Sequence, residues 1–320
     1  MTHLAIIGAG QIGSRHLQAL AQLNRPTQIQ LVDPSPESLE RARERFDQIQ
    51  GNGLVKLKAL TDLRDLSSPI DLAIIATAAN VRRSVIERLL HEKSVSHLIL
   101  EKVVFQSESD FLAVAALLVQ KKIKAWVNCP FRMWPGYQKI ASQQPKNLQF
   151  HVSGSQWGLA CNSIHYLDVF SFLTKTVPMT LSIEKLDEGS IPSKRQGFME
   201  MTGTLTGATE NGSFSLTSWR EGSAPVVVHM ATEEFQYTVR EDLGRAWVAK
   251  RELSPQLSWA ICEEAFQTPF QSQLTHLAVQ EILDHGTSSL PDYAASSKIH
   301  TPLLRAISSH LKGVQPCPIT

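Results

Sequence analysis

Short hydrophobic runs alternate with segments of helical spacing over residues 1–125. The runs LAIIGAG, IQLVD, DLAIIAT, HLILE and KAWVN are short and apolar, which predicts buried strands. Between them, QIGSRHLQALAQL, SPESLERARERF, NVRRSVIERLLHEK and SESDFLAVAALLVQKK repeat apolar residues at helical intervals. This alternation predicts an α/β domain over 1–125, a doubly wound parallel sheet with crossover helices.

The pattern changes near NCPFRMWPGYQ. From residue 126 onward, alternating segments joined by Gly, Asn and Ser turns predict antiparallel strands in LQFHVSG, LSIEKL, FMEMTGTLTG, GSFSLTSW, PVVVHMAT, FQYTVR and AWVAK. Helices are predicted in NSIHYLDVFSFLTK, QSQLTHLAVQEILDHG and SSKIHTPLLRAISSHLKG. Residues 126–320 are therefore expected to form an α+β domain with a large open antiparallel sheet, for substrate binding and oligomerisation. Whether the C-terminal helix packs back on the first domain is left open.

Composition narrows the function classes. The chain has 320 residues, 42% of them hydrophobic, with 31 basic and 30 acidic side chains, which gives no general attraction to nucleic acid. No apolar stretch is long enough to span a bilayer. Four widely spaced cysteines without a CxxC pair favour a reducing, cytoplasmic location. The eleven histidines show no metal-ligand spacing, so no metal site is expected.

A glycine turn follows the first predicted strand. In GAGQIG, the first glycine permits a tight turn, the second lets a pyrophosphate approach the backbone, and the third allows close helix–strand packing. Asp33 ends the next strand, where its carboxylate can accept hydrogen bonds from an adenosine ribose. This order predicts a Rossmann dinucleotide site that favours NAD, although Arg15, Arg41 and Arg43 keep NADP open. The expected residues are Gly8, Gly10, Gln11, Ile12, Gly13 and Asp33.

Two charges end a later apolar strand, LILEKVVF, residues 98–105. Ligands of open parallel sheets bind beyond the carboxyl ends of strands, where Glu101 and Lys102 are expected. A lysine near a nicotinamide ring can hydrogen-bond a substrate oxygen and favour a developing alkoxide. The alternative interpretation is an ordinary exposed pair at a strand terminus.

The order of GxGxxG, Glu-Lys and the HxxD of CNSIHYLDVF resembles the Gfo/Idh/MocA oxidoreductases along the whole chain. IIATAANVR and NCPFRM are similar to two further segments of that family. The resemblance implies a Rossmann domain joined to an open-faced antiparallel sheet. It also implies an NAD(P)-dependent dehydrogenase or reductase that acts on CH–OH groups of sugars, nucleotide sugars or cyclitols.

The resemblance also assigns roles to individual residues. Lys102 is expected to be catalytic and His165 to be the acid/base. Glu101 is expected to fix the lysine and the cofactor. The resemblance further implies Thr77 and Asn128 at the nicotinamide end, and Arg132, Trp157, Asn162 and Asp168 on the substrate side.

Three departures from the family pattern bear on function. Val103 and Ala78 stand where prolines are usual, and Cys161 stands where many members carry an aspartate, four residues before His165. His165 can work alone, because an ordinary imidazole titrates near neutrality. A purely structural helix-start histidine is the alternative. For Cys161 a packing role is expected.

The sequence therefore predicts hydride transfer between NAD(H) and a carbinol or carbonyl carbon of a sugar-like substrate, carried out by a carbohydrate-metabolism enzyme. One alternative is a sensor that binds a dinucleotide or sugar without chemistry. Another is an enzyme that keeps its cofactor bound for internal redox. Because few helices are available to cover the second sheet, a homodimer or homotetramer is expected to bury its open face.

Overall fold

The computed structural model describes residues 1–49, 53–177, 180–251 and 259–320. The chain forms two compact units. The first comprises Met1–Pro130, Pro269–Ser297 and Thr320, and the second comprises Phe131–Thr268 and Lys298–Ile319. The first unit runs to Pro130, five residues past the boundary predicted at residue 125, and also takes in a segment from late in the chain.

The first unit is built on a six-stranded sheet with the order β3-β2-β1-β4-β5-β6, and all neighbouring strands are parallel. The strand order reverses between β1 and β4, and in such sheets a ligand crevice lies beyond the strand ends at this reversal. The strands are β1 (Thr2–Ile7), β2 (Thr27–Val32), β3 (Val55–Leu60), β4 (Ile70–Ile75), β5 (Val95–Glu101) and β6 (Lys124–Asn128).

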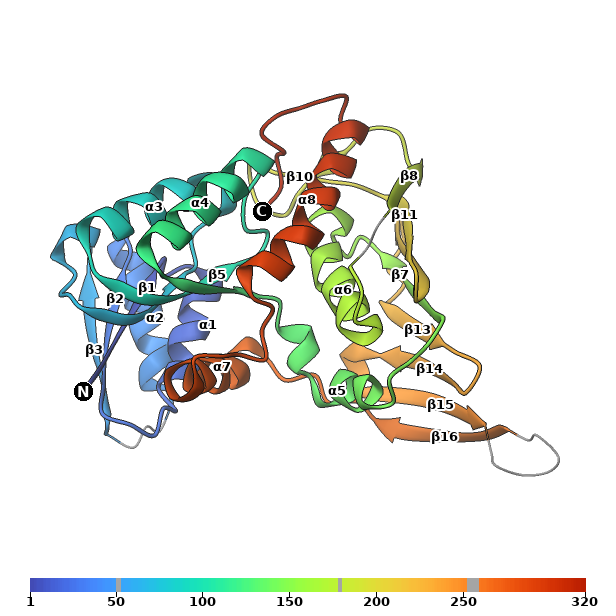
Figure 1. Cartoon of the computed structure of the whole chain (residues 1–320), viewed down its shortest axis with the longest axis horizontal. Coiled ribbons are helices and arrows are strands. Elements are labelled where there is room, and N and C mark those ends of the chain that lie inside the picture. Colours follow the sequence, from blue (N-terminus) through green and yellow to red (C-terminus); the bar gives the residue numbers. More distant parts are fainter. Residues whose placement is uncertain (50–52, 178–179, 252–258) are drawn as a thin grey trace. The chain divides into compact units, whose positions relative to one another are not determined.

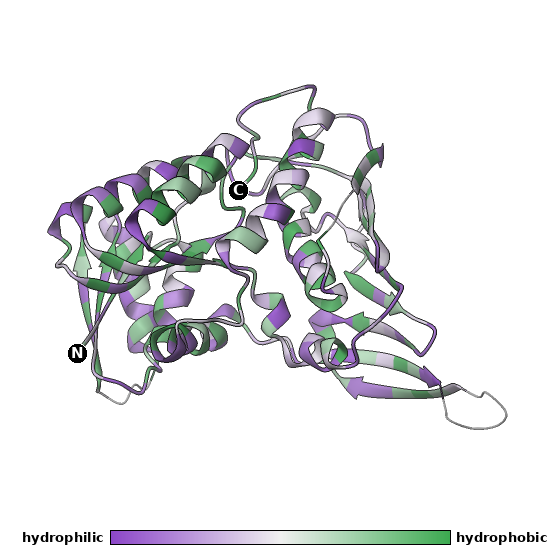
Figure 2. Ribbon diagram, viewed as in Figure 1, coloured by the Kyte–Doolittle hydropathy of each residue, from purple (hydrophilic) through white to green (hydrophobic). Residues whose placement is uncertain are grey.

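Helices cover both faces of this sheet. The helices α3 (Ala79–Glu92) and α4 (Glu108–Lys121) lie on one face, and α1 (Gln11–Leu20), α2 (Pro36–Asp47) and α7 (Gln271–His285) lie on the other (Figure 1). The side chains of Ser35 and Ser107 accept hydrogen bonds from the first turns of α2 and α4, as expected of N-caps. Both hydrophobic and hydrophilic residues are visible on α3 and α4, as befits helices with one face buried (Figure 2). A short 3₁₀ turn, η1, spans Leu63–Asp65.

The helix α7 belongs to the first unit, although it comes late in the chain. It packs beside α1, where the Gln22 side chain donates to the carbonyl of Ser272 at 2.9 Å, and Arg25 pairs with Asp284. Sequence reasoning placed this helix in the second domain. Its position beside α1 brings residues of α7 to the carboxyl edge of the first sheet.

The second unit contains an eight-stranded sheet with the order β16-β15-β14-β13-β7-β12-β11-β8. The strands β7 and β12 pair in parallel and the other neighbours pair antiparallel, so the expected large antiparallel sheet is mixed at this one pair. The strands are β7 (Leu148–Ser155), β8 (Thr180–Leu186), β11 (Gly203–Thr209), β12 (Gly212–Trp219), β13 (Val227–Ala231), β14 (Phe235–Arg240), β15 (Arg245–Arg251) and β16 (Trp259–Ala265).

The remaining described elements are short strands, 3₁₀ turns and helices. They are β9 (Ile191–Pro192) and β10 (Met199–Glu200), which pair with each other, the 3₁₀ turns η2 (Pro130–Met133) and η3 (Glu241–Leu243), and the helices α5 (Pro135–Ser142), α6 (Leu159–Thr174) and α8 (Tyr293–His310). Among the described residues, no helix combines the length and hydrophobicity that a membrane crossing requires.

The two faces of the second sheet differ in character. On one face, Phe150 and Phe214 are buried and contact Phe170 of α6. The register places His151, Ser215, His229, Thr238 and Trp247 in one row across the opposite face. The row across the open face is thus polar except for Trp247.

Candidate functional site

The glycine turn leads from β1 into α1. Gly8 has a φ of 103°, in the left-handed region that favours glycine. A Cβ on Gly13 would lie 1.8 Å from the carbonyl oxygen of Gly8, so close packing of α1 on the turn excludes any side chain there. A Cβ on Gly10 would meet no atom within 4 Å. That open space at the start of α1 fits the approach of a pyrophosphate to the helix N-terminus.

Asp33 follows β2 and is tied to the glycine turn. One carboxylate oxygen accepts a hydrogen bond from the Ala9 amide at 2.7 Å, and the other accepts one from the Ser35 amide at 2.9 Å. A carboxylate offers about four acceptor sites, so both oxygens keep capacity for ribose hydroxyls. The geometry therefore suits the role that the sequence predicted for Asp33.

Two of the three arginines that kept NADP open have partners on their own helices. Arg15 donates to the Gln18 side chain at 2.8 Å, and Arg41 contacts the Ser38 hydroxyl at 3.4 Å. Arg45, which sequence reasoning missed, reaches from α2 to Ser14 and Gln11 at the start of α1. The sequence signal for Arg45 was its position on α2, four residues and about one helical turn after Arg41.

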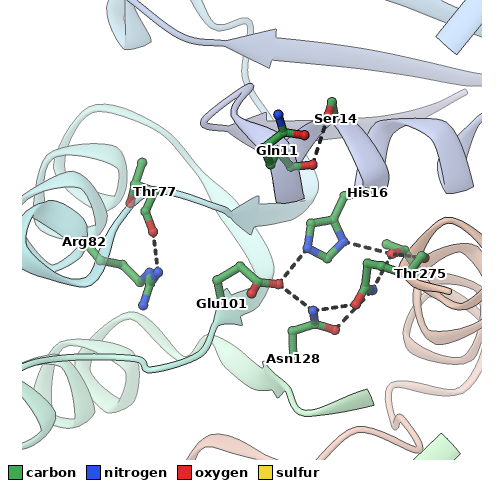
Figure 3. A network of polar contacts seen from close by, with 9 residues as sticks. Gln11, Ser14, His16, Thr77, Arg82, Glu101, Asn128 and Thr275 are labelled. Atoms are coloured by element: carbon green, nitrogen blue, oxygen red, sulfur yellow. Dashed lines mark hydrogen bonds and ion pairs between the residues drawn. The ribbon is translucent and has the colours of Figure 1, made fainter. Parts of the chain in front are cut away.

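A closed ring of polar side chains lies at the carboxyl ends of β5 and β6 (Figure 3). One oxygen of Glu101, Oε1, accepts from His16 Nε2 at 2.8 Å and from Asn128 Nδ2 at 2.5 Å. His16 Nδ1 lies 2.8 Å from the Thr275 hydroxyl. Gln271 closes the ring, because its amide donates to Thr275 at 2.8 Å and exchanges hydrogen bonds with Asn128. Glu101 and Asn128 were predicted, whereas His16, Gln271 and Thr275 were not.

The ring holds Glu101 as an anion. Burial alone would raise the pKa of Glu101, but the hydrogen bond from His16 and the nearby positive charges outweigh it, so its pKa lies below the ordinary value. A carboxylate can only accept, which assigns the proton to His16 Nε2. His16 Nδ1 is within hydrogen-bond distance of the Thr275 hydroxyl, which donates to the backbone carbonyl of Gln271 at 3.2 Å.

Lys102 directly follows Glu101 and is half-buried, and the peptide bond that joins it to Val103 is cis. The next turn is held by Arg82 of α3, which is buried and donates to the carbonyls of Val103 at 2.5 Å and Val104 at 2.7 Å. Arg82 also donates to the carbonyl of Thr77.

Thr77, after β4, has a buried hydroxyl without a hydrogen-bond partner among the described residues. A buried hydroxyl without a partner is uncommon and is costly unless something else pairs with it. The Thr77 hydroxyl, the open space at Gly10 and the Asp33 carboxylate together fit a bound dinucleotide.

In the second unit, His165 lies on α6 and is almost fully buried. Its ring stacks on Phe131, with centroids 4.4 Å apart and planes 14° apart, and Phe131 stacks in turn on Trp134 at 4.1 Å. This aromatic stack fixes the plane of the imidazole. Neither aromatic residue was singled out from the sequence.

Arg132 and Asp168 form a bidentate ion pair within the second unit. Arg132 Nε donates to one carboxylate oxygen at 2.7 Å and Nη2 donates to the other at 2.6 Å. The guanidinium also lies over the ring of Phe172, 5.2 Å from its centroid. Burial raises the pKa of Asp168 to about 6, and Arg132 opposes this rise. The structure thus brings together two residues that were predicted on the substrate side.

The first turn of α6 gathers the other predicted residues. Trp157 donates to the carbonyl of Thr217 at 2.7 Å, and the Asn162 amide donates to the carbonyl of Trp157 at 2.7 Å. Cys161 stands where a carboxylate was expected, and the carboxylate at this turn comes from Glu200 instead. Glu200 is buried and accepts from the Ala160 amide at 2.8 Å. Its sequence context, FMEMTG, gave no sign of this position.

Comparison with protein families confirms the resemblance in the first unit. Residues 2–129 match the GFO_IDH_MocA model, an oxidoreductase family with an NAD-binding Rossmann fold. Over these residues the chain thus matches an NAD-binding Rossmann domain of the oxidoreductases, and NAD is the cofactor that the family description names. Among proteins with curated descriptions, none matches the chain.

Solved structures share the fold of the whole chain. An oxidoreductase from Agrobacterium radiobacter, in complex with NAD+, L-tartaric acid and magnesium, is 18% identical with a TM-score of 0.73, covering 98% of this chain and 97% of the other. UDP-N-acetylglucosamine 3-dehydrogenase GnnA from Acidithiobacillus ferrooxidans is 14% identical with a TM-score of 0.68, covering 95% and 96%. A super-repressor mutant of Gal80p from Saccharomyces cerevisiae is 14% identical with a TM-score of 0.70, covering 98% and 97%. Identities this low establish the fold alone.

Proposed function

We propose that the protein is an NAD(H)-dependent dehydrogenase or reductase that acts on a CH–OH or carbonyl carbon of a sugar, nucleotide sugar or cyclitol. The observation that carries the proposal is the ionised Glu101, held by His16 and Asn128 directly beside Lys102. The pair lies at the carboxyl edge of the sheet that carries the glycine turn and Asp33, where a dinucleotide is expected.

The glycine turn, Asp33 and Thr77 would hold the cofactor, which when bound supplies or accepts a hydride. In the oxidation direction, the substrate carbinol loses a hydride from carbon and a proton from oxygen, and becomes a carbonyl. The Lys102 ammonium donates a hydrogen bond to that oxygen and stabilises its developing negative charge. His165 takes up the hydroxyl proton, and in the reverse direction it returns that proton.

The substrate class is part of the proposal. GnnA, which shares the fold, is a UDP-N-acetylglucosamine dehydrogenase, so this scaffold accommodates a nucleotide sugar in at least that protein. Trp157 and Asn162 at the start of α6 offer an aromatic surface and an amide, groups that suit a polyhydroxylated ligand. The ion pair of Arg132 with Asp168 leaves those two residues a supporting role in shaping the site.

A sensor without chemistry is the second candidate. Cys161 replaces the acid expected before His165, and Gal80p, whose super-repressor mutant has the same fold, gives an example of this scaffold outside the dehydrogenases named here. A sensor would bind NAD(H) or a sugar but would not interconvert them. The retained Lys102, the anionic Glu101 and the oriented His165 favour the enzyme.

The test is a screen of nucleotide sugars, keto-sugars and cyclitols with NAD(H), followed by the variant Lys102→Ala. Removing one donor to a developing oxyanion typically costs about 2.7–4 kcal/mol, roughly a hundred- to thousandfold in kcat. Lys58→Ala, on the exposed edge strand β3 of the same sheet, is the matched control and should retain full activity. Full turnover by Lys102→Ala would refute the catalytic assignment, and binding without any turnover would favour the sensor.

A further inference from the structure

His16 occupies an unusual position for a residue of a sheet-covering helix. It is fully buried on α1, six residues after Gly10, and both ring nitrogens have side-chain partners. One partner, Glu101, is 85 residues away in sequence and the other, Thr275, is 259 residues away. Figure 3 shows the imidazole pointing from α1 toward the end of β5, between these two partners. A histidine needed only for packing would not require two directed polar contacts.

The contacts of His16 decide how Glu101 lies. His16 and Asn128 donate to the same oxygen of Glu101, from α1 and from β6, so the carboxylate is held from two elements. The charged groups that act on Glu101 are His16 on α1, Arg82 on α3 and the adjacent Lys102. Of these, His16 supplies the direct hydrogen bond. Without it, the side-chain amide of Asn128 would remain as the neutral donor to the buried carboxylate.

We propose that His16 is a positioning residue, which couples the helix of the dinucleotide turn to Lys102 by holding Glu101 as an oriented carboxylate. The proposal rests on the proposed function, because the reaction is what gives the orientation of Lys102 its importance. His16 acts through Glu101 and does not itself contact the reacting atoms. The ring through Thr275 and Gln271 extends the coupling to α7.

Two substitutions of nearly equal chemistry separate this role from packing. In His16→Asn the amide occupies the place of Nδ1, which keeps the contact with Thr275 and removes the donor to Glu101. In His16→Gln the amide reaches the place of Nε2 and keeps that donor. His97→Asn is the control, because His97 lies on the same strand as Glu101, and its Nδ1 contacts the backbone carbonyl of Asp71 at 3.0 Å, away from the polar ring.

The measurements use the full-length protein. The titration of the Glu101 carboxyl is followed by carbon-13 NMR, with the resonance assigned through Glu101→Gln, and NADH affinity is followed by fluorescence. The pH profile of kcat is measured on the substrate found in the screen.

In His16→Asn, the pKa of Glu101 is expected to rise and the acid limb of the kcat profile to move to higher pH with it. A displaced catalytic group commonly costs about a hundredfold, so kcat should fall by roughly 10- to 100-fold. Substrate KM and the Kd for NADH should change by less than about threefold, because the substitution weakens the stabilisation of the transition state and not the binding of either ligand. His16→Gln should recover most of the activity, and His97→Asn should match the wild type.

Equal behaviour of His16→Asn and His16→Gln, in the titration and in the kcat profile, would overturn the proposal. Failure of the proposed function is a separate result: the wild type would bind NADH and convert no substrate. The Glu101 titration then decides the role of His16 by itself. A shift in His16→Asn that is absent in His16→Gln supports the positioning role, and an unchanged titration rejects it.

Discussion

The Asp33 carboxylate accepts a hydrogen bond from the amide of Ala9 at 2.7 Å, so the acid after β2 is fixed against the glycine turn after β1. Because the second oxygen is held by the Ser35 amide, the carboxylate has one orientation before any ligand arrives. A ribose diol can pair with such a carboxylate, whereas a 2′-phosphate would be repelled by it.

Asp33→Ala should therefore reduce the preference for NAD(H) over NADP(H), mainly because the affinity for NAD(H) falls. Isothermal calorimetry with both cofactors measures the two affinities. Asp71→Asn is the matched control, since Asp71 accepts from the His3 amide near the start of β4 and should leave both affinities unchanged. Equal or tighter binding of NADP(H) by the wild type would contradict the assignment.

The ionised Glu101 also predicts a pH dependence of stability. Its pKa in the folded protein lies below the ordinary value, so at acid pH the unfolded chain binds more protons at this residue than the folded chain does. The stabilisation is present above the ordinary glutamate pKa of about 4.5 and is lost as the pH falls through the lower folded value. Urea unfolding at a series of acid pH values gives the free energy of unfolding as a function of pH. This free energy should depend less steeply on pH in Glu101→Gln than in the wild type, and equal dependence would count against an anionic Glu101.

The pairing of Arg132 with Asp168 predicts an asymmetric response to mutation. Arg132→Met leaves the buried Asp168 carboxylate without its partner, which typically costs about 3–5 kcal/mol in the free energy of unfolding. The double variant Arg132→Met with Asp168→Leu should recover a large part of that loss, because an apolar pair needs no compensation. Denaturant unfolding of both variants and the wild type gives the comparison, and a single variant as stable as the wild type would refute the structural role.

Assembly is predicted through the open face of the eight-stranded sheet. The register places Trp219, Trp247 and Trp259 on that face, and each is about half exposed, at 48%, 39% and 41%. We expect a homodimer or homotetramer that buries these rings, and Trp247→Glu should shift it toward the monomer in light scattering. Leu112→Glu, which alters an exposed apolar residue on α4, should not. A monomeric wild type at micromolar concentration would be evidence against this interface.

The acid/base assignment has its own test on the same helix. His165→Ala should lower kcat by about a hundredfold or more, the usual contribution of a positioned proton-transfer group. Cys161→Ala, one turn earlier on α6, should have little effect because the thiol is assigned only a packing role. Steady-state kinetics of both variants decide the point, and a large loss in Cys161→Ala would show that the thiol takes part.

The hydrophobic pattern was sufficient for most of the fold. The pattern missed the two-residue strand β9 and the edge strands β3 and β16. At a sheet edge one side of the strand is not paired, and in β3 the charged residues Lys56 and Lys58 interrupt the apolar run. Proline at the start of α5 and its length of only eight residues concealed that helix.

The candidate site was predictable only where residues are close in sequence. The glycine turn with Asp33, and Glu101 with Lys102, form local patterns. The ring that joins His16, Glu101, Asn128, Gln271 and Thr275 depends on the return of α7 to α1, which no periodicity reveals. Polar residues on apolar helix faces, such as His16 and Arg82, were the available signal, and without the packing they resemble ordinary surface residues.

Deuterium transfer from NADH deuterated at C4 tests the central claim most directly. The wild type is incubated with the labelled NADH and the carbonyl form of the substrate found in the screen, and the product is analysed by mass spectrometry. If the protein catalyses hydride transfer as proposed, the product carries one deuterium at the former carbonyl carbon, and Lys102→Ala slows its appearance by roughly a hundred- to thousandfold. A protein that binds both ligands while all the deuterium stays on NADH would contradict the account.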